Sequence, residues 1–160
     1  MMKTFSFYQI ENLLYNATFP KVVTKILKEE GKVIILCANK EEMRQLDNLL
    51  WTFAQLSFLP HATEDDACDA SLQDVLLVTK QPNNNPDNRV LVATSEKLVL
   101  QQDLESYTKI FVINNQPINV QEFMNSLNRC TEELNAKHFV QKSDGSWQHG
   151  ICAGSVASVI

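Results

Sequence analysis

The chain has 160 residues, 44% of them hydrophobic and 21% charged, so it can bury a core and is not a disordered acidic polymer. Its length is typical of one domain that needs no disulfides for stability. The 14 basic and 19 acidic residues give a net charge of −5, which argues against a domain held to nucleic acid by a basic face.

The first predicted elements are a strand and a helix. Residues 4–10 (TFSFYQI) alternate large and polar side chains, which is typical of a strand. A helix is predicted over residues 18–30, with Thr18 as its N-cap and Pro20 in its first turn. Gly31 then stands where a left-handed C-cap is required.

A second strand and a second helix follow. Residues 33–38 (VIILCA) are apolar on both faces, which favours a strand covered by helices on both sides. Asn39 and Glu42 form a variant of the capping box and predict a helix that runs through Trp51. Three apolar residues mark its inward face: Met43, Leu46 and Leu50.

The second half contains three further predicted strands, over residues 74–79, 89–94 and 110–113. Asn119, with Glu122 three residues later, is predicted to cap a final helix that continues through Lys137. One face of that helix carries Phe123, Leu127, Cys130 and Leu134.

This order of elements predicts an α/β fold, a three-layer sandwich in which helices flank a largely parallel open sheet. From residue 143 onward the pattern dissolves into small residues. We therefore expect an α/β domain over residues 1–142 and a flexible C-terminal tail over 143–160.

The polar residues indicate neither a phosphate loop nor a metal site. The four glycines fit neither G-x-x-x-x-G-K-[ST] nor G-x-G-x-x-G. The four cysteines include no C-x-x-C, and the three histidines are not spaced as zinc ligands. We expect no cofactor and no metal. Because no run approaches a signal peptide or a membrane span, we expect a cytoplasmic protein.

One pattern suggests catalysis. His61 stands close to four carboxylates, Glu64, Asp65, Asp66 and Asp69, and a histidine oriented by an acid can act as a general base. An α/β enzyme with an atypical nucleotide or phosphate site near His61 is therefore the alternative function. A solvated acidic loop explains the same residues without any chemistry, and we favour that interpretation.

A cluster of apolar residues around the end of the second helix is more informative. It comprises Leu49, Leu50, Trp51, Phe53, Leu56, Phe58 and Leu59. Leu50 and Trp51 are neighbours and lie about 100° apart on a helix, so both cannot face one narrow stripe. Either the aromatic rings fold back as ordinary core, or they stay exposed as a protein–protein hot spot.

These residues also carry a resemblance. Arg44–Trp51 (RQLDNLLW) followed by Ser57–His61 (SFLPH) resembles the signature of the chi subunit family of bacterial DNA polymerase III. That family has a first strand containing FY and a second strand that begins G-K-x-apolar. They are matched here by Phe7–Tyr8 and Gly31–Val33. The likeness covers about residues 3–142.

The resemblance implies a non-catalytic accessory subunit with a Rossmann-like fold that has no phosphate-binding loop. Chi subunits pair with the psi subunit, which ties them to the clamp loader. By this likeness Trp51, Phe53, Phe58 and Pro60 form the apolar seat for psi. No membrane contact and no strong direct binding of nucleic acid are implied.

The family also binds the acidic, Asp/Phe-containing C-terminal tail of the single-stranded-DNA-binding protein, usually through a basic final helix. Here the implied receptor residues are Arg129, Lys137 and Lys142, and the helix also carries Glu132 and Glu133. These two acids would repel an acidic peptide. A protein that has lost this contact and keeps only the clamp-loader side is therefore a further alternative. An alternative basic strip on the first helix consists of Lys21, Lys25 and Lys28. The water-facing side of that helix explains the same three residues, and we favour that interpretation.

Overall fold

The computed structural model describes residues 3–53, 61–66, 73–80, 85, 88–127, 134–149 and 158–159. The helices are η1 (Asn12–Leu14), α1 (Tyr15–Glu30), α2 (Lys40–Phe53), α3 (Glu96–Leu100) and α4 (Val120–Leu127). The strands are β1 (Lys3–Gln9), β2 (Val33–Leu36), β3 (His61–Thr63), β4 (Val75–Val78), β5 (Val90–Ala93), β6 (Lys109–Asn114), β7 (Leu134–Gln141), β8 (Trp147–His149) and β9 (Ser158–Val159).

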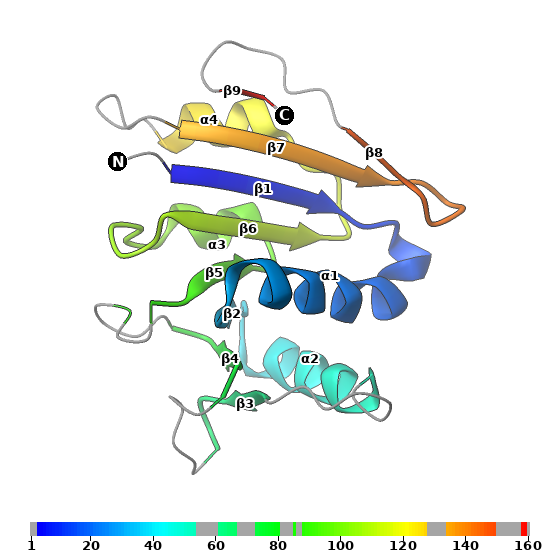
Figure 1. Ribbon diagram of the computed structural model, residues 1–160, viewed down its shortest axis with the longest axis vertical. Helices are drawn as coiled ribbons and strands as arrows, with labels where there is room; N and C mark the ends of the chain where they lie inside the picture. Colours follow the sequence, from blue (N-terminus) through cyan, green and yellow to red (C-terminus); the bar gives the residue numbers. More distant parts are fainter. Residues whose placement is uncertain are drawn as a thin grey trace.

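These strands form one open sheet in the order β3-β4-β2-β5-β6-β1-β7-β8, and β9 also pairs with β7 (Figure 1). The pairs are parallel except for the hairpin of β7 and β8. The N-terminal strand β1 therefore lies inside the sheet, between β6 and β7. β3 and β8 lie at its two ends.

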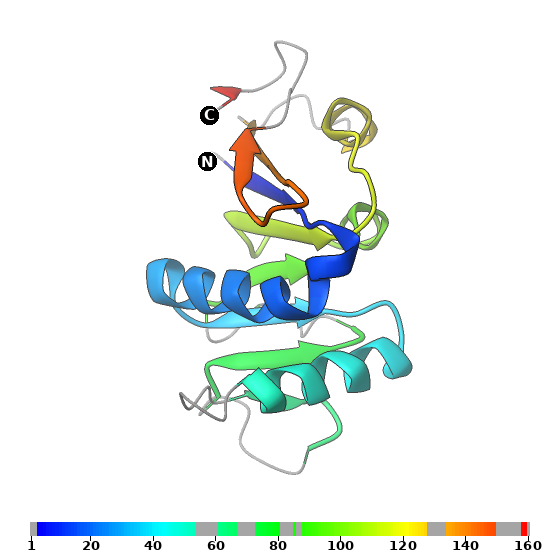
Figure 2. The same cartoon turned by 90° about the vertical axis from the view of Figure 1, so that its right-hand side faces the viewer.

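Helices cover both faces of the sheet (Figure 2). Successive strand residues alternate between two buried clusters, as Ile34 and Ile35 of β2 do. One cluster packs against α1 and α2 and the other against α3 and α4. The predicted fold class, a three-layer α/β sandwich with a largely parallel open sheet, is confirmed.

Two helices, α2 and α4, begin directly after the capping residues that the sequence predicts. The Glu42 backbone N–H donates to Asn39 Oδ1 at 2.8 Å, and the Glu122 N–H donates to Asn119 Oδ1 at 3.0 Å. Gly31 has a φ of +96°, and its N–H donates to the Leu27 carbonyl, as a C-cap does. The predicted cap at Thr18 is wrong. The helix begins at Tyr15, one turn earlier, and Thr18 is buried within it.

The final helix was predicted too long. Its described part is Val120–Leu127, and residues 134–141 form β7, so Lys137 lies on a strand and not on the helix. The physical reason is long-range pairing, since β7 runs parallel to β1 with Ala136 opposite Phe5 and His138 opposite Phe7. Period-2 burial of Ala136 and His138 against the sheet outweighs the helical spacing read from the sequence. Residues 128–133 lie outside the described part of the chain.

The predicted tail also begins with regular structure. Residues 143–145 form a turn, in which the Gly145 N–H donates to the Lys142 carbonyl, and β8 follows. Phe139, Val140 and Gln141 pair with β8 in antiparallel register. Residues 143–149 thus comprise a turn and the strand β8, and the division into a domain over residues 1–142 and a flexible tail over 143–160 stays a prediction.

Candidate functional site

The carboxyl edge of a parallel sheet is where α/β proteins bind ligands, in the crevice where neighbouring strands connect to opposite faces. Here β2 leads to α2 on one face, and its neighbour β5 leads to α3 on the other. A carboxylate of the chain itself bridges this position. Glu42 Oε1 accepts from the Ala38 backbone N–H at 2.9 Å and from the Thr94 hydroxyl at 2.6 Å. An anionic ligand would compete with Glu42 for these donors and meet its negative charge.

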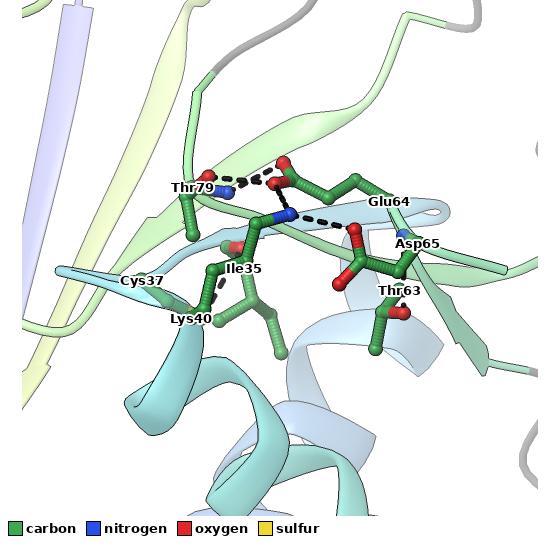
Figure 3. A network of polar contacts seen from close by, with 7 residues as sticks. All are labelled: Ile35, Cys37, Lys40, Thr63, Glu64, Asp65 and Thr79. Atoms are coloured by element: carbon green, nitrogen blue, oxygen red, sulfur yellow. Dashed lines mark hydrogen bonds and ion pairs between the residues drawn. The ribbon is translucent and has the colours of Figure 1, made fainter.

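A second polar network occupies the adjacent part of the same edge (Figure 3). Lys40 Nζ, in the first turn of α2, donates to Glu64 and to Asp65 Oδ1, which follow β3. Glu64 also accepts from the Thr79 backbone N–H at 2.8 Å and from the Thr79 hydroxyl at 2.6 Å. Burial alone would raise the pKa of Glu64, but the bonds from Lys40 and Thr79 lower it to about 2. The predicted acidic loop is therefore tied to the sheet by ion pairing.

The exposed aromatic feature lies at the other end of α2. Trp51 is 56% exposed, although its neighbour Leu50 is fully buried. The 100° between successive helix residues places one side chain in the core and the other outside it. Trp51 is thus not ordinary core, which was one of the two interpretations left open by the sequence.

His61 connects Trp51 to the edge strand β3. The rings of Trp51 and His61 have centroids 4.6 Å apart, and His61 Nε2 lies 3.2 Å from Asp47 Oδ1. Asp47 and Trp51 are one turn apart on α2, so both can meet the same residue of β3. Burial raises the pKa of Asp47, and the charge of His61 acts in the opposite direction. We call these three residues the Trp51 cluster.

The Trp51 cluster joins the two halves of the sequence signature. Asp47 and Trp51 belong to the RQLDNLLW segment, and His61 ends the SFLPH segment. The sequence had suggested His61 as a base and had given Asp47 no role. The signals for Asp47 were its place in the RQLDNLLW segment and its spacing of four residues from Trp51 on an amphipathic helix.

The geometry does not suit a catalytic base. The side chain of His61 is fully buried and already contacts a carboxylate and an indole, whereas a general base must reach a substrate. No group of three potential metal ligands occurs in the part of the chain that the structure describes. Within the same part, no helix has the length and apolar character needed to cross a bilayer.

The remaining predicted site residues fall into two groups. Phe58, Pro60 and Arg129 lie outside the described residues, and Phe53 is the last residue of α2. Lys137 lies on β7, and Lys142 lies at the turn into β8. Since β3 and β8 are at opposite ends of the sheet, these lysines are far from the Trp51 cluster (Figure 1).

Comparison with known proteins agrees with the resemblance seen in the sequence. Residues 2–133 match the family model described as DNA polymerase III chi subunit, HolC. A protein of Rickettsia prowazekii (strain Madrid E) named "Probable DNA polymerase III subunit chi" is 23% identical over 150 residues, which cover 91% of each chain. With a family match over most of its length, the chain belongs to the DNA polymerase III chi subunit family, whose place is in DNA replication.

Proposed function

We propose that this chi family member is a non-catalytic adaptor of the bacterial cytoplasm. It links the clamp loader, through a psi-like subunit, to the single-stranded-DNA-binding protein. The observation that carries the proposal is the half-exposed indole of Trp51, held against His61 at the edge of the sheet.

Trp51 has the properties of an interface anchor. Tryptophan is enriched at hot spots because it buries a large apolar area with few rotatable bonds. Contact with His61 on one side restricts the indole before any partner binds, which reduces the entropy lost on association. Phe53, Phe58 and Pro60 are proposed to complete the seat for psi.

The polar contacts weigh against the alternative, an enzyme with a nucleotide or phosphate site near His61. The imidazole of His61 is buried. Glu42 places a carboxylate at the carboxyl edge of the sheet, where β2 and β5 lead to opposite faces. The position best suited to a phosphate is therefore bridged by an anion of the chain itself.

The second proposed contact is with the acidic tail of the single-stranded-DNA-binding protein, through Arg129, Lys137 and Lys142. Lys137 and Lys142 belong to the opposite end of the sheet from Trp51. An adaptor needs two surfaces that do not compete, and this separation lets both partners bind at once.

The test is reconstitution of the three-component complex from purified proteins. The chain is expected to co-elute with the psi subunit of the same organism in gel filtration, and the pair is expected to retain the single-stranded-DNA-binding protein. Removing the acidic tail of that protein should abolish retention without affecting the chi–psi pair. A folded chain that binds no psi would refute the adaptor function, and a thermal shift with ATP would favour the enzyme.

A further inference from the structure

Asp47 offers little surface to a partner, but it contacts the residue against which Trp51 rests. The side chain of Asp47 is 24% exposed and that of His61 is fully buried. Asp47 Oδ1 and His61 Nε2 lie 3.2 Å apart, and solvent reaches neither atom. Because water cannot hydrate these two atoms, their mutual contact compensates for the hydration that both lost on folding. The carboxylate therefore determines which way the ring nitrogen faces.

The backbone that carries His61 is held by both β4 and α2. His61 pairs with Val75 of β4 in parallel register. Directly after β3, Glu64 accepts from Lys40 in the first turn of α2. The two ends of β3 are thus tied to the two ends of α2. With the backbone fixed in this way, the freedom that remains to His61 is rotation of its side chain, and the contact with Asp47 removes it.

The imidazole passes this restraint on to Trp51. The two ring centroids are 4.6 Å apart, with 57° between the ring planes, so the rings are in contact. Asp47 and Trp51 are one turn apart on α2, and α2 therefore meets the imidazole through two side chains of one face. Trp51 is 56% exposed, and the orientation of its exposed indole depends on Asp47 through His61.

We propose that Asp47 is a positioning residue of the psi interface. It fixes the imidazole of His61, which in turn keeps the indole of Trp51 in the orientation that psi receives. The inference deepens the proposed function and rests on it for the identity of the partner. It assigns to Asp47 an effect on affinity that acts through Trp51. A direct contact of Asp47 with psi fits less well, because the side chain is three-quarters covered and its Oδ1 is buried.

The expected effect follows from the freedom that the indole gains. Ordering one side chain that was free to rotate lowers affinity by about three- to tenfold. Asp47→Asn keeps the shape of the side chain and removes its charge. We therefore expect the dissociation constant for psi to rise by about three- to tenfold, much less than the loss of the whole indole would cause.

Isothermal titration of psi into the purified full-length chain measures this effect. The matched control is Glu41→Gln, which makes the same change in net charge at an exposed residue in the first turn of the same helix. The control is expected to bind psi as the wild-type chain does. In a Trp51→Ala background, Asp47→Asn should have no further effect, because the indole that it positions is gone. An equal loss in both backgrounds would overturn the proposal, since Asp47 would then act without Trp51.

Tryptophan emission tests the positioning role without psi. Trp51 is the sole tryptophan of a Trp147→Phe chain, because the sequence has two. In that chain, Asp47→Asn should lower the anisotropy of the emission and increase its quenching by acrylamide, whereas Glu41→Gln should change neither. Unchanged emission in an Asp47→Asn chain that urea unfolding shows to be folded would overturn the proposal.

A second variant keeps the test decisive if Asp47→Asn does not fold. His61→Gln removes the ring and retains a polar group for Asp47. It should free the indole and weaken psi binding to the same extent, and unchanged anisotropy and affinity would overturn the proposal. Where both single variants fold, adding Asp47→Asn to His61→Gln should change the emission no further.

Failure of the positioning role and failure of the adaptor function give different results. If Asp47→Asn frees the indole but the wild-type chain binds no psi, the positioning of Trp51 is right and its assigned partner is wrong. If the wild-type chain and Asp47→Asn bind psi equally tightly and show the same emission, the positioning role is wrong and the adaptor function stands.

Discussion

Replacement of Trp51 by alanine should weaken the complex with psi without unfolding the chain. A tryptophan side chain can bury about 200 Å², and 56% of Trp51 is exposed in the free chain. A partner can therefore cover about 110 Å² of indole, which at about 25 cal/mol per Å² contributes about 3 kcal/mol. The dissociation constant should rise by about 100-fold.

The matched control is Trp147→Ala. Trp147 is the other tryptophan, is 38% exposed and lies at the opposite end of the sheet. Isothermal titration of psi into each variant gives the two dissociation constants, and urea unfolding checks that both remain folded. A Trp51→Ala chain that binds psi as tightly as Trp147→Ala does would refute the assignment of Trp51 as an anchor.

Three predictions concern stability and reactivity. Because the pKa of Glu64 is lowered to about 2 from 4.5, its ionised form stabilises the fold above pH 4.5, and this stabilisation is lost as pH falls towards 2. Glu64→Gln should therefore flatten the acid limb of a stability–pH curve measured by urea unfolding, and an unchanged limb would contradict this. Burial lowers the pKa of His138, so the unfolded chain binds the proton better and stability should fall as pH drops below 6.5. His138→Phe should remove that slope, and the same slope in the variant would show that other groups cause it. Burial raises the pKa of the Cys37 thiol to about 12, so a thiol reagent should modify Cys37 at the rate of unfolding, as mass spectrometry of its peptide can show.

The parts of the fold that the sequence predicted are those set by neighbouring residues. Asn39 and Asn119 cap their helices through bonds to residues three positions later, and such signals are readable without the rest of the chain. The apolar run of β2 likewise predicted burial on both faces, and all four of its residues are buried. The strand β7 was missed because its partner, β1, is more than a hundred residues away, and spacing within the segment also suited a helix.

The same division applies to the candidate site. The sequence indicated the exposed aromatic cluster through the adjacent Leu50 and Trp51. It did not reveal that Asp47 and His61 meet, since that contact depends on how α2 packs on β3. A groove between α1 and the hairpin of β7 and β8 has no signal in the sequence. That groove brings Lys21 and Lys25 together with rings from β1, β7 and β8, which are far apart in the chain.

The interior position of β1 constrains the order in which a newly made chain can fold. Thr4 pairs with Lys109 of β6 on one side and with Asn135 of β7 on the other. β1 is the first strand to leave the ribosome, but it cannot complete its pairing until β7 has been made. Before β6 is made β1 has two open edges, and before β7 is made it has one, and open edges are prone to pairing with other chains. A chain cut short before β7 would keep one of those edges open permanently, and we expect such fragments to aggregate even though α1 and α2 are intact.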